Sequence, residues 1–275
     1  MKLRALLKRK EALVIPGVYN AATALLAQDA GFKAIYVSGA AISNSCGLPD
    51  TGLLSMEEVA WLSSYIIAAV KIPVIIDADT GYGGLKETRQ CVRLFEEAGA
   101  SAVQIEDQES PKRCGHLSGK SVVSTKEFCE KIKVACKARR SKDTLIIART
   151  DVRAAEGIDG AIERARAYIE AGADVVFPEA LKTRAEFAVF SSAIKAPLIA
   201  NMTEFGVTPY IKAAEFRKMK YAGVIFPVTA FRAGMRAAKE VFAELSSKGS
   251  QAGILKKLET RSAINRLLNY DPRKC

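Results

Sequence analysis

The sequence predicts a single (β/α)8 barrel domain over 1–275, a fold in which eight parallel strands alternate with helices. Eight short apolar runs rich in β-branched residues recur along the chain, and each is typical of a buried parallel strand. Amphipathic helical patterns separate them at an average spacing of about 30 residues, the length of one βα unit. Eight such units without an evident linker favour a closed barrel over an open doubly wound sheet, which usually has about five or six strands.

Each predicted strand is a short run of apolar, often β-branched residues. In order along the chain the strands are 13–17, 34–39, 73–79, 102–107, 144–150, 174–179, 197–201 and 222–227. The helical patterns between them include 23–32, 87–100, 125–138 and 160–173. Several of these patterns end with a glycine just before the next strand, as a helix C-cap does.

Two connections and the C-terminal segment are longer than a barrel needs. The predicted loops 38–55 and 107–125 are long, and long loops in compact domains tend to carry function. The second loop is rich in Gly, Ser and Lys, so we predict that it is an active-site lid. After the eighth strand, 231–249 is one predicted helix and 251–270 is a second, amphipathic one. The segment 250–275 is thus predicted as a helical extension whose apolar face needs a partner.

The composition, 49% hydrophobic and 26% charged, is that of a soluble globular protein. The longest charge-free stretch near the N-terminus, 12–28, contains Pro16 and Gly17, so it does not form an apolar membrane span. Charges at 8–11 interrupt the apolar region that a signal peptide needs. We therefore expect a cytoplasmic protein without membrane contact. The six cysteines show no CxxC or zinc-ligand spacing and are expected to be reduced thiols.

The net charge of +11 leaves three classes of partner open: nucleic acid, a membrane surface or an anionic small molecule. Basic residues cluster at 2–10, 131–142 and 273–274. Few aromatic residues are interleaved with them, so each cluster is interpreted as a solvated helix face rather than a nucleic-acid site. We expect no nucleic-acid partner, and charge alone does not name another.

Carboxylates gather at the carboxyl ends of two predicted strands, where a barrel has its active site. Asp77 and Asp79 end the third strand and point to the same face, and Glu106 and Asp107 end the fourth. Oxygen ligands without His or Cys favour Mg²⁺, with Mn²⁺ as the alternative. Four solvated acids are the other interpretation, but carboxylates at adjacent strand ends repel each other unless a cation lies among them.

The remaining strand ends add two arginines and further polar side chains. They are Arg149, Thr150, Asp151, Glu179, Asn201, Thr203 and Arg232. Two arginines at one barrel mouth suit bidentate binding of carboxylates, so we predict a small polycarboxylate substrate. The segments after the last two strands lack the Gly-rich pattern that binds phosphate in many barrels, which disfavours a phosphosugar enzyme.

The predicted lid carries Cys114 between Arg113 and His116, the single histidine of the chain. Neighbouring cations lower the pKa of a thiol, and a thiol placed in this way becomes a usable acid or base. We therefore expect a lowered pKa for Cys114 and a role in the chemistry. The alternative for both Cys114 and His116 is an ordinary loop role without chemistry.

Taken together, these residues resemble the isocitrate lyase and phosphoenolpyruvate mutase superfamily, and within it the methylisocitrate lyases, along essentially the whole chain. The most specific element is KRCGH at 112–116, which is similar to the lyase signature loop. The supporting motifs are YVSG at 36–39, GLPD at 47–50, DADTGYG at 77–83, IEDQ at 105–108, ARTD at 148–151, NMTEFG at 201–206 and AFRA at 230–233. The resemblance implies a Mg-dependent barrel that exchanges its last helix between subunits and forms a homotetramer.

The resemblance also implies roles for individual residues. Asp77 and Asp79 would serve the metal, with Asp50 and Glu106 supporting it. The residues that would bind substrate are Ser38, Gly39, Ala40, Gly115, His116, Arg149, Glu179, Asn201, Thr203, Arg232 and, on the C-terminal extension, Arg261. Space for one methyl group would come from Phe177, Ile225 and Pro227, a feature worth about 1–3 kcal/mol in discrimination.

The implied reaction is a magnesium-assisted retro-Claisen cleavage of 2-methylisocitrate to pyruvate and succinate. Cys114 would be the general acid that protonates the departing carbanion. Tyr36, at the end of the second strand, or a metal-bound water would remove the hydroxyl proton. Within the superfamily, isocitrate lyase stays open because Leu117 follows the KRCGH loop in the style of those enzymes, and so does an oxaloacetate decarboxylase or phosphonate-type enzyme. A non-catalytic anion-binding barrel is the alternative from another class.

Overall fold

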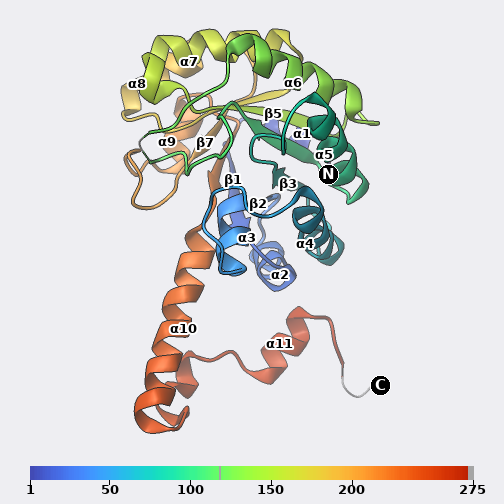
Figure 1. The fold of residues 1–275 in the computed structure, drawn as a ribbon. Coiled ribbons are helices and arrows are strands. Elements are labelled where there is room, and N and C mark those ends of the chain that lie inside the picture. The colour runs from blue at the N-terminus through green and yellow to red at the C-terminus, as the bar shows by residue number, and fades with distance from the viewer. Residues whose placement is uncertain (118, 272–275) are drawn as a thin grey trace.

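The computed structural model describes residues 1–117 and 119–271 and has the predicted barrel (Figure 1). Its strands are Leu13–Val18 (β1), Ile35–Val37 (β2), Val74–Asp77 (β3), Ala102–Glu106 (β4), Leu145–Thr150 (β5), Val175–Pro178 (β6), Ile199–Asn201 (β7) and Gly223–Phe226 (β8). They lie in the order β6-β5-β4-β3-β2-β1-β8-β7, and all neighbouring pairs are parallel. A parallel bridge between Val176 and Leu198 brings β6 to β7 and completes the circle. Ser118 of the predicted lid and the last four residues of the predicted extension lie outside the described residues.

Helices precede, separate and follow the strands (Figure 1). They are Leu3–Leu7 (α1), Ala21–Asp29 (α2), Gly39–Ser45 (α3), Met56–Ala69 (α4), Leu85–Glu97 (α5), Thr125–Ala138 (α6), Arg153–Glu170 (α7), Arg184–Ala193 (α8), Ala213–Lys218 (α9), Thr229–Lys248 (α10), Ala252–Lys257 (η1, a 3₁₀ helix) and Arg261–Leu267 (α11). The segment 38–55, predicted as a loop, contains α3, because Ser38 caps a helical turn by accepting a hydrogen bond from the Ala41 N–H at 3.3 Å. Of the helices described, none has the length and apolar character to cross a membrane.

The interior of the barrel is filled from its amino end. Leu3, Leu6 and Leu7 of α1 are buried there against side chains from the inner face of the sheet, including Ile15, Ile75, Ile147 and Ile199. Two further apolar clusters lie between the sheet and the surrounding helices. Since α1 fills the amino end, the carboxyl ends of the strands are left as the open end where a site can form.

The predicted lid over 107–125 leaves the barrel after β4 and returns to it at α6. The Val123 N–H donates to the Asp107 carbonyl at 2.9 Å and so holds the two ends of the loop together. Within it, the Gln108 side-chain amide exchanges two hydrogen bonds of 2.9 Å with the Arg113 backbone. These bonds set the path of the segment that carries KRCGH.

The C-terminal part of the chain differs from the barrel. None of the 20 residues of α10 is buried, and the helix extends away from the barrel (Figure 1). The prediction of one helix over 251–270 is wrong, because the segment forms η1 and α11 instead. Thr260 causes the break: its side chain accepts a hydrogen bond from the Ala263 N–H at 3.1 Å and starts a new helix.

Candidate active site

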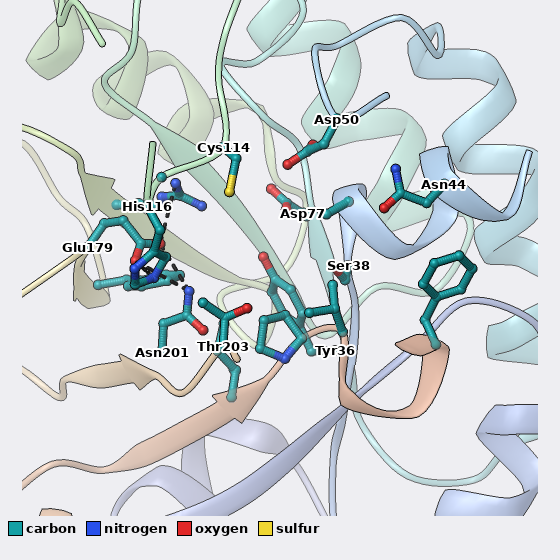
Figure 2. A pocket seen from close by; sticks show the side chains of 18 of the residues that line it. Tyr36, Ser38, Asn44, Asp50, Asp77, Cys114, His116, Glu179, Asn201 and Thr203 are labelled. Carbon is teal, nitrogen blue, oxygen red and sulfur yellow. Dashed lines mark hydrogen bonds and ion pairs between the residues drawn. The ribbon is translucent and has the colours of Figure 1, made fainter. Parts of the chain in front are cut away.

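A cavity of about 250 Å³ lies at the carboxyl ends of the strands (Figure 2). The structure brings most of the predicted site residues together around it, namely Tyr36, Ser38, Ala40, Asp50, Asp77, Cys114, Gly115, His116, Arg149, Phe177, Glu179, Asn201, Thr203, Ile225, Pro227 and Arg232. The other predicted residues near it, Gly39, Asp79 and Glu106, lie behind this lining and contact it, with Glu106 buried beside Arg149.

One side of the cavity, which we call the acidic side, consists of Asp50, Asp77, Asp79 and Lys112. Asp77, the last residue of β3, accepts hydrogen bonds from the backbone N–H groups of Gly39 and Asp79, each at 3.2 Å. The Lys112 ammonium comes from the lid, contacts Asp50 and lies 2.8 Å from Asp79 Oδ1. Three carboxylates against one ammonium leave this side short of positive charge.

The acidic side has the donor set of a divalent-cation site. Glu106 Oε1, which is buried next to this side, has no hydrogen-bond partner. Burial raises the pKa of Asp79 to about 6, although Lys112 opposes this. A bound cation would give the unpartnered oxygen a contact and would stabilise the charged form of Asp79. No group of three or more Asp, Glu, His or Cys side chains in the described part of the chain is arranged to ligate a metal directly. Mg²⁺ is commonly held by one or two carboxylates and several waters, and the neighbouring Asp77 and Asp79 supply such a pair of carboxylates.

A buried chain of hydrogen bonds joins Tyr36 to Asp77 through Gln104. The Tyr36 hydroxyl donates to Gln104 Oε1 at 2.5 Å, and Gln104 Nε2 donates to Asp77 Oδ1 at 3.1 Å. Burial, followed by the charge of Asp77, raises the pKa of Tyr36 well above its ordinary value. In this arrangement the phenol keeps its proton, which opposes the predicted role of Tyr36 as a base.

The opposite side, which we call the guanidinium side, consists of His116, Lys120, Arg149, Asp151 and Glu179. Arg149 is buried and donates to Asp151 through Nε at 2.8 Å and Nη2 at 3.0 Å. Its Nη1 lies 3.2 Å from Glu106, and its Nη2 lies 3.3 Å from Glu179. The guanidinium carbon is 5.3 Å from the centre of the Phe177 ring. Because every nitrogen faces a carboxylate, the guanidinium is held in one orientation.

His116 links the lid to the loop after β7. Its Nδ1 accepts a hydrogen bond from the Val207 N–H at 3.2 Å, so the proton resides on Nε2, which lies 2.9 Å from Glu179 Oε1. The ring packs so closely on Gly206 that a Cβ there would lie 2.8 Å from His116 Cγ. Burial by itself would raise the pKa of Glu179, but Arg149 and His116 hold it well below its ordinary value. Glu179 is therefore a fixed anion.

The Cys114 thiol points into the cavity between the two sides (Figure 2). A turn in which the Leu117 N–H donates to the Cys114 carbonyl at 2.9 Å holds the segment. Burial raises the pKa of the thiol above its ordinary value, although the His116 N–H opposes this. The expected lowering is therefore wrong, because removal from water outweighs the nearby cations. A thiol that stays protonated at neutral pH is the form that a general acid needs.

The remaining predicted residues divide into two groups. Asn201, at the end of β7, donates from Nδ2 to Glu179 at 3.2 and 3.3 Å. Arg232 lines the cavity while paired with Glu204 at 2.8 Å. Arg261, in contrast, begins α11 and is exposed, and the structure does not bring it to the cavity. The reason is that α10 carries the following segment away from the barrel mouth (Figure 1).

The site residues that were not predicted include Gln104, Lys112 and Lys120, besides Asn44, Val228 and Phe231 of the cavity lining. Gln104 carries a sequence signal, because it is a polar residue inside the apolar run of β4 and must have a buried partner. The two lysines flank Cys114 in the lid, and lysines in a loop are usually exposed. Only the path of the loop shows that both are buried against carboxylates.

Residues 3–246 match the model of the phosphoenolpyruvate phosphomutase family. The chain belongs to this family. Among its relatives is the 2-methylisocitrate lyase of Aeropyrum pernix, 52% identical over 268 residues, which cover 98% of this chain and 86% of that protein. The 2-methylisocitrate lyase of Bacillus subtilis is 45% identical, with 98% and 89% covered.

Solved structures of the family have the same fold. A crystal structure of 2,3-dimethylmalate lyase is 35% identical, with a TM-score of 0.91 over 97% of this chain and 90% of that one. A phosphonopyruvate hydrolase complex with oxalate and Mg²⁺ is 32% identical, with a TM-score of 0.88 over 97% and 93%. The family thus includes proteins that act on different small acids, and the residues of the cavity must decide among them.

Proposed function

We propose that the protein is a lyase that cleaves 2-methylisocitrate to pyruvate and succinate. The observation that carries the proposal is the half-buried Cys114 thiol, which has a raised pKa and is directed into a cavity with acids on one side and a fixed guanidinium on the other. The names of the relatives support it, since two that match nearly the whole chain are 2-methylisocitrate lyases. The cell compartment we propose is the cytoplasm.

The bond that breaks is C2–C3 of the substrate. The C2 hydroxyl loses its proton to a water molecule and becomes the carbonyl of pyruvate, while the electron pair of the broken bond remains on C3 of the succinate fragment. Cys114 then transfers its thiol proton to C3, and the proton released from the hydroxyl returns to the thiolate through water, so that no proton is gained or lost over the reaction. Tyr36 donates a hydrogen bond to Gln104 and does not take the hydroxyl proton, in keeping with its raised pKa.

Asp77 and Asp79 would hold Mg²⁺, with Asp50 and Glu106 around them and Mn²⁺ as a substitute. When bound, the ion polarises the hydroxyl and the carboxylate on C2 of the substrate. Support comes from the unpartnered Oε1 of Glu106, from the excess of carboxylates over Lys112 on the acidic side, and from the Mg²⁺ complex of the related phosphonopyruvate hydrolase.

The substrate carboxylates would contact the guanidinium side and the start of α3. Arg149, His116 and Gly115 would bind one carboxylate, with Glu179 orienting the first two. The residues for the others would be Ser38, Gly39, Ala40, Asn201, Thr203 and Arg232, most of which line the cavity. Phe177, Ile225 and Pro227 also line it and present apolar surface to the extra methyl group. This apolar surface favours 2-methylisocitrate over isocitrate.

We also propose that the chain forms a homotetramer in which α10 and the segment after it pack on a second copy. Support comes from the apolar residues that α10 exposes, Met235 at 56% and Phe242 at 67%, since exposed apolar patches of this kind mark interfaces. Arg261 would then contact the cavity of a neighbouring subunit. Light scattering on the purified protein tests this, because four chains of 29.7 kDa are expected and a monomer would contradict it.

The test of the reaction compares pyruvate release from 2-methylisocitrate with glyoxylate release from isocitrate, each with Mg²⁺ and with excess EDTA. We expect faster cleavage of 2-methylisocitrate, abolished by EDTA. Equal or faster cleavage of isocitrate would assign the protein to that substrate instead. If neither compound is cleaved, the proposed reaction is wrong, and oxaloacetate and phosphonopyruvate are the next compounds to assay.

A further inference from the structure

Lys120 of the lid is buried on the guanidinium side. Its side chain is 3% exposed, and its ammonium lies 2.8 Å from Oδ1 of Asp151, whose side chain is fully buried. A buried ammonium next to a buried carboxylate is costly to desolvate. The contact therefore needs an explanation beyond stability, and the neighbours of Asp151 supply one.

Asp151 Oδ1 is shared between two cations. It accepts a hydrogen bond from Lys120 Nζ at 2.8 Å and one from Arg149 Nη2 at 3.0 Å, whereas Oδ2 accepts from Arg149 Nε at 2.8 Å. Asp151 itself is fixed from behind, because its backbone N–H donates to Asp107 at 2.8 Å. Of the two bonds from Arg149 to Asp151, the one from Nη2 is the longer. Lys120 thus interacts with part of the negative charge that would otherwise bind Nη2.

The same nitrogen of Arg149 faces the lid and the cavity. Nη2 also lies 3.3 Å from Glu179, and it approaches Gly115 so closely that a Cβ at that residue would overlap it. Glu179 in turn pairs with His116 of the lid. Each carboxylate that contacts Nη2 is therefore also contacted by a lid residue, Lys120 for Asp151 and His116 for Glu179.

Lys120 also connects this charge to the position of the lid, because its ammonium donates to the Gly115 carbonyl. Gly115 directly follows Cys114 in the chain. When the lid lies as it does here, the ammonium contacts both the partner of Arg149 and the backbone beside the thiol. Lys120 therefore connects the charge around Arg149 to the position of the backbone beside Cys114.

We propose that Lys120 is a positioning residue for the substrate: it draws the charge of Asp151 away from Arg149 Nη2, so that this nitrogen binds a substrate carboxylate while Lys120 holds the position seen here. The inference rests on the proposed function for the identity of the substrate. Lys120 acts through Arg149. Its replacement is therefore expected to weaken binding of the substrate carboxylate and to leave proton donation by Cys114 intact.

The experiment compares Lys120→Arg, Lys120→Met and Lys120→Gln, with Lys126→Met on α6 as the control that removes the same charge from an exposed position. Two quantities are measured on the full-length protein with Mg²⁺: KM and kcat for 2-methylisocitrate, and the Kd of succinate by calorimetry. Gln retains a donor for the Gly115 carbonyl but lacks the charge, so it separates the electrostatic role from bracing of the lid.

We expect Lys120→Met and Lys120→Gln to raise KM and the Kd of succinate about tenfold, with kcat changed less than about threefold. Lys120→Arg is expected to restore both within about twofold, and Lys126→Met to match the wild type. Unchanged KM and Kd would overturn the inference. So would a fall in kcat alone, or a Gln variant that behaves like the wild type, because either shows that Lys120 only braces the lid. A wild-type protein that binds succinate but cleaves neither substrate disproves the proposed reaction, and the Kd comparison still decides the role of Lys120.

Discussion

The two sides of the cavity differ in how their charges are compensated. On the guanidinium side every nitrogen of Arg149 faces a carboxylate, and each of Glu179 and Asp151 also contacts a lid side chain, His116 and Lys120 respectively. On the acidic side, in the described residues, the Lys112 ammonium is the one cation that pairs with Asp50 and Asp79. The first side is complete in the protein itself, and the second is arranged for an added cation. This division suits a substrate that carries both carboxylates and a hydroxyl.

Cys114 lies between the two sides, and its replacement is the strongest test of whether they act on one reaction. Cys114→Ser should lower kcat on the order of a thousandfold, because a serine hydroxyl is a far weaker acid than a thiol and general acids contribute about 10²–10⁴. Pyruvate release and the circular dichroism spectrum are the two measurements. Cys129→Ser, on α6 outside the cavity, is the matched control. Wild-type turnover in Cys114→Ser would remove the thiol from the mechanism.

Arg149→Lys tests whether the guanidinium side depends on a planar, bidentate cation. The ammonium keeps the charge but cannot face Asp151, Glu106 and Glu179 together. We expect kcat/KM to fall about a hundredfold, mainly through a higher KM. Arg184→Lys, which alters an exposed pair with Glu215, should leave the kinetics unchanged. A normal KM in Arg149→Lys would show that charge suffices at this position.

Gly206→Ala probes the link between the lid and the loop after β7. The new Cβ would lie 2.8 Å from His116 Cγ, so the ring must move and loses its bond from Val207 or its contact with Glu179. We expect about a tenfold loss of kcat/KM with little change in folding stability, since the site is at the surface of the barrel mouth. Gly84→Ala is the control, because its Cβ would approach no closer than 3.4 Å. Equal kinetics in the two variants would show that the position of His116 is unimportant.

The fold was predictable because each strand of a closed parallel barrel is buried on both faces and leaves an unbroken apolar run. β6 illustrates this, since Val175–Pro178 is apolar and buried throughout and was predicted to within one residue at each end. The C-terminal extension was not predictable in the same way. Its apolar residues have helical spacing, but Thr260 accepts a hydrogen bond from Ala263 and divides the segment into two short helices.

Within the site, residues on strand ends were easier to predict than residues whose position depends on the lid. Asp77, Arg149 and Asn201 end or nearly end their strands, so parallel topology alone brings them together. Lys112 and Lys120 are buried only because of the path of a loop whose turns involve nonlocal bonds. Cys114 shows the same limit, because the charges beside it in sequence indicate a lowered pKa and its burial raises it.

The smallest expected effect concerns the acidic side, and it separates the two sides without any assay of activity. Saturating Mg²⁺ should raise the melting temperature by several degrees, since binding at about 100 times Kd stabilises a protein by about 2.7 kcal/mol. Asp77→Asn removes a carboxylate from the acidic side and should abolish most of this shift. Glu179→Gln removes one from the guanidinium side and should preserve it, because Glu179 contacts only cations and donors that the protein itself provides in the residues described. Scanning calorimetry with and without Mg²⁺ measures both variants. If both lose the shift equally, the cation interacts with the whole cavity, and the division between a complete side and a cation-requiring side is wrong.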